Sequence, residues 1–122
     1  EDLIPPPTGN ESDDSYQLLP LEDISREWAM WKELVDGGEF AGQSSGPDKG
    51  IRDDWWHAGW IPFAANGAGD SICLDLNPAK GGRVGQVITM NHESSERRLL
   101  ANSFAEWLAD LAESLENRDS DE

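Results

Sequence analysis

Sulfur and imidazole chemistry have little basis in this sequence, because its 122 residues include one cysteine and two histidines. Cys73 has no partner for an intrachain disulfide, and one cysteine with two histidines cannot supply a zinc cluster of the usual spacing. We therefore expect no metal and no other cofactor. A lone thiol is typical of a reducing compartment, so we expect a cytoplasmic protein.

Basic residues are also scarce, since 9 Lys and Arg face 25 Asp and Glu and the formal net charge is -16. A field of that sign repels phosphate backbones and anionic lipid, so we expect no direct nucleic-acid binding and no membrane binding. The charge suits docking on a basic protein partner. It equally suits a small domain that acidity merely keeps soluble, and both interpretations stay open.

Long apolar runs are missing as well. No segment approaches the roughly 20 apolar residues of a membrane span. The first residues lack the basic and apolar regions of a signal peptide, and they lack an initiator methionine. We therefore interpret the chain as a processed form or a fragment.

Composition divides the chain into three parts. Residues 1–16 contain five acidic residues and no basic one, and residues 113–122 contain five acidic residues and one arginine. We predict a disordered or extended acidic arm over residues 1–15, a single domain over residues 16–116 and an acidic tail over residues 117–122. A chain of this length supports one modest core.

Apolar spacing and end signals predict two helices. The first begins after Pro20 and stops at Gly37. Its apolar residues recur at helical intervals: Ile24, Trp28, Trp31 and Val35. The second begins with a capping box, in which Ser103 accepts from the Glu106 amide and the Glu106 carboxylate reaches back to the Ser103 amide. Its stripe contains Phe104, Trp107, Leu108, Leu111 and Leu115. We expect this helix to end near Leu115.

The middle of the chain is β in character. We predict strands over residues 60–64, 71–76, 86–90 and 97–101, separated by polar or glycine-rich turns. Pro62 places the first of them at an edge or at a strand end.

Alternation in the second strand places three aliphatic side chains on the core face, where the stripe of the second helix covers them, and leaves a more polar opposite face. They are Ile72, Leu74 and Leu76. The predicted fold class is α+β, with a small twisted antiparallel sheet of three to five strands packed against N-terminal and C-terminal helices.

Six residues are candidate partner contacts: Asp53, Asp54, Trp55, Trp56, Asp70 and Asp75. The first four follow a long connection over residues 39–54, and loops of that length are often functional. Adjacent tryptophans cannot both face one core, so we expect at least one of Trp55 and Trp56 to face a partner.

A small hydrolase that uses Asp70 or Asp75 is the enzymatic hypothesis. The two carboxylates lie five residues apart, so in a continuous strand they would point to opposite faces, and no residue has the spacing of an activating partner. We interpret Cys73 as a small half-buried side chain and His92 as a surface imidazole without a visible partner. We therefore predict a protein that is not an enzyme.

An ordered series of motifs resembles the Smi/Knr family of the SUKH superfamily. The motifs are Trp60-Ile61-Pro62-Phe63-Ala64, Asn66-Gly67-Ala68-Gly69-Asp70, Cys73-Leu74-Asp75-Leu76, Gly85-Gln86-Val87 and Ser103-Phe104-Ala105-Glu106-Trp107. Asp70 and Asp75 match family motif positions that also suit the capping of turns. Members usually begin with a further helical segment, so either an N-terminal piece is missing or this is a short variant.

The resemblance implies an α+β binding scaffold without known catalysis. Bacterial members are similar to immunity proteins of polymorphic toxin systems, and fungal members are similar to regulators of cell-wall synthesis and signalling. The acidic balance favours the first, with a basic toxin domain as the protein partner. A regulatory scaffold is the alternative. The sequence does not indicate an oligomeric state.

Overall fold

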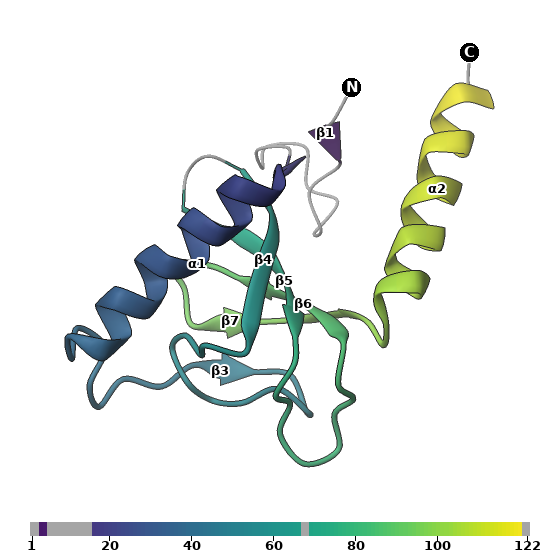
Figure 1. Ribbon diagram of the computed structural model, residues 1–122. Coiled ribbons are helices and arrows are strands. Elements are labelled where there is room, and N and C mark those ends of the chain that lie inside the picture. The colour runs from purple at the N-terminus through teal and green to yellow at the C-terminus, as the bar shows by residue number, and fades with distance from the viewer. Residues whose placement is uncertain (1–2, 5–15, 67–68, 121–122) are drawn as a thin grey trace.

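The computed structural model describes residues 3–4, 16–66 and 69–120, and for residues 3–4 and 115–120 it describes the backbone alone. Its elements in chain order are β1 (Leu3–Ile4), β2 (Tyr16–Leu18), α1 (Leu21–Asp36), β3 (Gly46–Pro47), β4 (Trp60–Ala65), β5 (Ser71–Asp75), β6 (Gln86–Met90), β7 (Glu96–Arg97), β8 (Leu99–Ala101) and α2 (Phe104–Ser120). Figure 1 shows α1 lying across the sheet and α2 standing at the other side of the molecule.

The strands of the described residues form two sheets. A six-stranded antiparallel sheet has the order β1-β2-β4-β5-β6-β8, and a small sheet pairs β3 with β7 in parallel. The hairpin of β5 and β6 is regular, with five successive residue pairs from Ser71 opposite Met90 to Asp75 opposite Gln86. The α+β class is confirmed, and the main sheet has six strands where three to five were expected.

Both faces of the main sheet are buried, each by a different helix. The α2-side core contains Tyr16, Phe63, Ala64, Ile72, Val87, Ala101 and Trp107. The α1-side core contains Trp31, Ile51, Trp56, Trp60, Cys73, Ile88 and Met90. The second face is the more polar one, as predicted, but it is buried and not solvent-facing, because its β5 residues Ser71, Cys73 and Asp75 are at most 1% exposed. Leu76, expected in the core, lies beyond β5 and is 49% exposed.

Pro62 lies inside the sheet and not at an edge or strand end, contrary to the prediction. Its strand β4 lies between β2 and β5. The pairing register of β4 with β5 shifts between Pro62 and Ala64, which leaves Phe63 as an extra residue on one strand. A bulge tolerates a proline because the hydrogen-bonded ladder is already interrupted there. The bulge also turns both Phe63 and Ala64 into the α2-side core.

The first helix confirms its predicted limits. Pro20 is the N-cap of α1, and Glu22 and Asp23 occupy the first turn, where the positive end of the helix dipole favours acids. At the other end the Gly37 amide donates to the Glu33 carbonyl at 2.9 Å, and the Gly38 amide donates to the Val35 carbonyl at 3.0 Å. Gly38 follows at φ +83°, a conformation that favours glycine and turns the chain away from the helix axis.

The second helix confirms its predicted start but not its predicted end. The Glu106 amide donates to Ser103 Oγ at 3.1 Å, while the Glu106 carboxylate accepts from the Asn102 amide at 3.2 Å and not from Ser103. Trp107 packs edge-on against Phe63, with 4.9 Å between ring centroids. The helix runs to Ser120, beyond the expected end near residue 115, and so covers part of the predicted acidic tail.

The predicted strand over residues 97–101 is divided in two. Leu99–Ala101 pairs with β6, whereas Glu96–Arg97 pairs with β3 of the long connection. The division follows from Arg97, whose side chain turns inward and is 1% exposed. At the chain start, Leu3–Ile4 pairs with β2, and the rest of the predicted arm over residues 1–15 lies outside the described residues.

Candidate functional site

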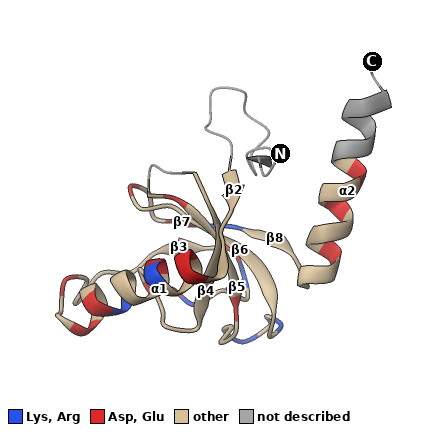
Figure 2. Ribbon diagram, turned by 45° about the horizontal axis from the view of Figure 1, so that its top comes forward, with Lys and Arg blue, Asp and Glu red and all other residues tan. Residues whose placement is uncertain are grey.

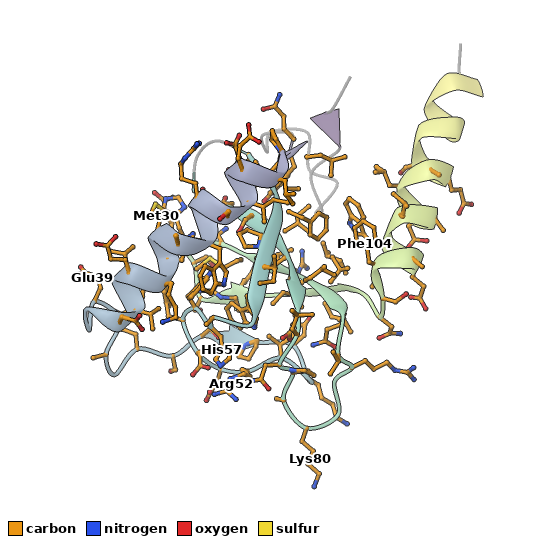
Figure 3. The ribbon with its side chains drawn as sticks, in the orientation of Figure 1. Met30, Glu39, Arg52, His57, Lys80 and Phe104 are labelled. Atoms are coloured by element: carbon orange, nitrogen blue, oxygen red, sulfur yellow. The ribbon has the colours of Figure 1, made fainter. Side chains whose placement is uncertain are left out.

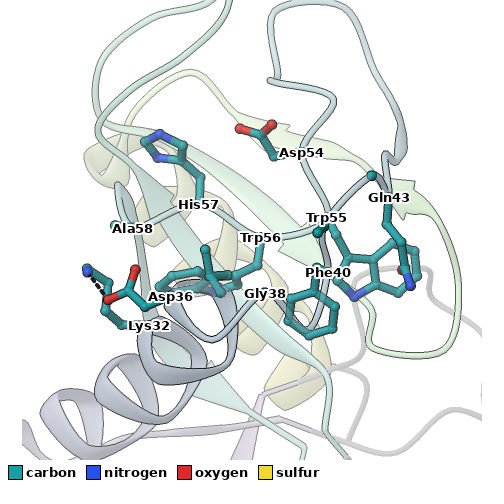
Figure 4. A pocket seen from close by; sticks show the side chains of 13 residues that line it. Lys32, Asp36, Gly38, Phe40, Gln43, Asp54, Trp55, Trp56, His57 and Ala58 are labelled. Carbon is teal, nitrogen blue, oxygen red and sulfur yellow. Dashed lines mark hydrogen bonds and ion pairs between the residues drawn. The ribbon is translucent and has the colours of Figure 1, made fainter.

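A pocket of about 500 Å³ opens at the C-terminal end of α1. Its lining comes from the last turns of the helix, from the loop between residues 38 and 43, and from residues 54–58 (Figure 4). All three segments lie between residues 32 and 58, and the turn at Gly37 and Gly38 brings the loop back beside the helix. The pocket thus depends on how the long connection is held against α1.

Stacked aromatic rings hold the pocket's inner wall. Trp56 stacks on Trp31 of α1 with 6.2 Å between centroids, and Phe40 lies 5.8 Å from Trp31 and 6.2 Å from Trp55. The Trp28 indole nitrogen donates to the Ala58 carbonyl at 2.8 Å. Rings at these separations add to the free energy of folding beyond the area they bury. The 55–58 segment is therefore anchored on α1.

Arg97 fixes the same segment from the opposite side. Its Nη2 donates to the Trp55 carbonyl at 2.8 Å, and its guanidinium carbon lies 4.8 Å from the centre of the Trp55 ring. Its Nη1 donates to the carbonyls of Asn91, Ser94 and Glu96. Burial lowers the pKa of Arg97 to about 10, so the group is still charged at neutral pH. Sequence reasoning missed this residue.

The charged groups at the pocket are mostly paired carboxylates. Asp36 pairs with Lys32 one helical turn earlier, and Asp54 Oδ2 accepts from Arg52 Nε at 2.7 Å. In the close view of Figure 4, Asp54 and Asp36 lie on either side of Trp56. Acidic residues also gather at the end of α1 in the charge view of Figure 2. The pocket thus combines aromatic surface with a rim of carboxylates.

His57 adds a neutral group to the rim. Its Nδ1 accepts from the Gly59 amide at 2.8 Å, so that nitrogen carries no proton. Burial, followed by the nearby positive charge of Arg52, lowers the pKa of His57 from its ordinary value of 6.5. Figure 3 shows His57 and Arg52 on the same side of the molecule, below the sheet.

The six predicted contact residues fall into two groups. Asp54 and Trp55 are half-buried and line the pocket together with Trp56, and Asp53 is exposed beside them. Trp56 is 4% exposed and belongs to the α1-side core, so it has little surface for a partner. The prediction missed Phe40 and Asp36, which only the folded connection brings to this place.

Asp70 and Asp75 serve turns instead, and neither lines this pocket. Asp75 has no exposed surface, and its carboxylate accepts from the Asn77 amide at 3.0 Å and from Gln86 at 2.9 Å. This burial replaces the predicted partner contact at Asp75 by a structural role. Asp70 Oδ1 accepts from both the amide and the ring of His92. The prediction that His92 has no partner is therefore wrong.

Neither Asp75 nor Cys73 is placed to react with a substrate. Asp75 is sealed from substrate, and burial raises the pKa of the Cys73 thiol to about 12, which removes it as a nucleophile. Among the residues described, no group of three or more His, Cys, Asp or Glu could hold a metal ion. No helix in that part of the chain is long and apolar enough to cross a membrane.

The fold and the pocket define an α+β domain with a sheet buried on both faces and a pocket at one helix end. The chain belongs to the SMI1/KNR4 family (SUKH-1), whose family model matches residues 3–110.

Its curated relatives are fungal proteins. The chain is 30% identical to "Cell wall biosynthesis/cell cycle regulator smi1" of Schizosaccharomyces pombe, over 82% of this chain and 22% of that protein. It is 38% identical to a "KNR4/SMI1 homolog" of Yarrowia lipolytica, over 79% of this chain and 20% of that protein. A "Glucan synthesis regulatory protein" of Neurospora crassa is 33% identical over 60% of this chain. The chain thus spans about a fifth of the length of the first relatives.

Proposed function

We propose that this chain is the partner-binding domain of a cytoplasmic regulator of cell-wall polysaccharide synthesis. The observation that carries the proposal is the set of relatives, several of which are named as regulators of cell-wall assembly or glucan synthesis and align along this domain. A regulator needs a surface that recognises another protein, and a preformed pocket with aromatic walls and a polar rim is the kind of surface such recognition uses.

The test is a domain exchange in Schizosaccharomyces pombe. The segment of the fission-yeast regulator that aligns with this chain is replaced by residues 1–122, and a second strain carries a deletion of the same segment. We expect the exchange to restore growth on a dye that binds cell-wall polysaccharide and to restore incorporation of labelled glucose into glucan. An exchanged protein that is folded and expressed but behaves as the deletion contradicts the proposal.

A toxin-neutralising immunity protein is the second candidate, and the formal net charge of -16 is the observation that favours it. A negative surface speeds docking on a basic nuclease and covers its nucleic-acid groove. Its test is co-expression with basic nuclease toxin domains in a bacterial host. Survival that depends on this chain would support immunity, and the names of the relatives favour the regulatory role.

A further inference from the structure

The pocket at the end of α1 has a net negative surround. Seven charged residues lie in its lining or within two residues of it in the chain, five acidic and two basic: Lys32, Glu33, Asp36, Glu39, Arg52, Asp53 and Asp54. Both bases already pair with a carboxylate of the rim. The last turn of α1 contains no basic residue, so the negative end of its dipole adds to the same field.

The walls of the pocket offer aromatic surface to a cation. Phe40 and Trp55 are both half-buried and lie 6.2 Å apart in the lining. The Trp55 ring already has one guanidinium beside it, because Arg97 lies 4.8 Å from its centre on the inner side. A guanidinium stacks on aromatic rings and pairs with carboxylates through a planar fork, which an ammonium cannot do.

We propose that this pocket binds an arginine side chain of a partner protein, with the guanidinium between the aromatic wall and the carboxylates of Asp36 and Asp54. The proposal rests on the regulatory, protein-binding role above and names the partner chemistry of that same site. The side chains of Asp54 and Asp36 are 35% and 60% exposed, so both carboxylates are accessible from solvent.

The carboxylates at the rim disfavour binding of apolar or anionic side chains. An apolar side chain would remove water from two carboxylates without replacing their hydrogen bonds, which costs free energy. An anionic group would meet the five acids and the end of the helix dipole. His57 does not reverse this balance, because its Nδ1 accepts a backbone hydrogen bond and is thus unprotonated.

The test is a titration of the full chain with short peptides, followed in two-dimensional ¹⁵N NMR spectra. The peptides are capped, otherwise uncharged, and carry arginine, citrulline, lysine or leucine at one central position. Citrulline keeps the shape of arginine and removes its charge. We expect the arginine peptide to shift amide signals of residues 36–43 and 54–58 and to bind about tenfold more tightly than the citrulline peptide.

Two matched variants distinguish binding in the pocket from attraction by the overall negative charge of the domain. Asp54→Asn removes a carboxylate from the lining, and Asp53→Asn removes its exposed neighbour, which does not line the pocket. At about 0.15 M salt, where charges are screened beyond about 8 Å, we expect Asp54→Asn to weaken arginine binding about two- to fivefold. Asp53→Asn, which removes the same charge from outside the lining, should weaken it by less than about twofold.

Three results would overturn the proposal: a leucine or citrulline peptide that binds as tightly as arginine, shifts confined to another surface, or equal weakening by the two variants. Failure of the proposed function looks different. Arginine binding in this pocket together with a domain exchange that fails in yeast would leave the arginine site standing and reject the cell-wall role.

Discussion

Replacing Arg97 with methionine should destabilise the domain more than any exposed arginine replacement. Methionine keeps most of the buried stem and removes the guanidinium, which makes four hydrogen bonds to backbone carbonyls and lies against the Trp55 ring. Each buried acceptor left without a donor costs about 1–3 kcal/mol. Three of the four carbonyls belong to the turn over residues 91–96, where exposed neighbours let water return.

The free energy of unfolding should therefore fall by about 2–4 kcal/mol. Most of this loss comes from the Trp55 carbonyl and from the turn carbonyls that water does not reach. Urea unfolding followed by tryptophan fluorescence measures it as a lower midpoint at constant slope. Arg98→Met is the matched control, because Arg98 is exposed and its loss should change the free energy of unfolding by less than about 0.5 kcal/mol. Equal effects of the two replacements would refute the account of Arg97 as the anchor of the pocket wall.

Three further predictions concern single side chains. The Cys73 thiol, fully buried and with its pKa raised to about 12 by burial, should resist a thiol reagent until urea unfolds the chain, and native-state labelling would contradict this. Burial lowers the pKa of His57 in the folded state. Its contribution to the free energy of unfolding should therefore be fully present above pH 6.5 and be lost as the pH falls from 6.5 through the folded-state pKa. His57→Asn, whose oxygen can accept from Gly59 in the same way, should flatten that dependence in unfolding curves taken between pH 7 and pH 5; an unchanged slope would exclude His57 as its source. Ser103→Ala should cost about 1 kcal/mol of unfolding free energy, whereas the exposed Ser114→Ala should not, and equal effects would argue against the cap.

Local signals predicted the parts of the fold that local chemistry decides. The spacing of apolar residues predicted α1. Ser103 predicted the start of α2 at Phe104, because a cap acts within one helical turn. The β5–β6 hairpin followed from two short runs flanked by turn residues. The signals that set these boundaries lie within the elements or directly beside them.

Contacts between segments that are distant in sequence could not be predicted from local residue patterns. β3 pairs with β7 across about fifty residues, and nothing in Gly46-Pro47 indicates a strand. Arg97 has the sequence setting of an exposed strand residue, and its burial depends on carbonyls that only the folded turn presents. Asp75 looked like a surface carboxylate because its partner Gln86 lies on the next strand.

Only part of the candidate site could be predicted from the sequence, because its other residues come together only in the fold. Asp54 and Trp55 stood out because two acids and two tryptophans adjoin a long connection. Phe40 and Asp36 complete the pocket only after the turn at Gly38 brings the connection back to α1. Sequence spacing alone does not encode that approach, since it depends on the contact between the Phe40 and Trp31 rings.

The most direct test of the central claim asks which surface touches a partner in cells. A photoreactive amino acid is placed in the exchanged yeast regulator at Gln43, an exposed residue of the pocket lining, or at Val84, which is 72% exposed outside that lining. The account predicts a crosslinked protein from Gln43, reduced by Asp54→Asn, and none from Val84. A crosslink from Val84 with none from Gln43 would contradict it.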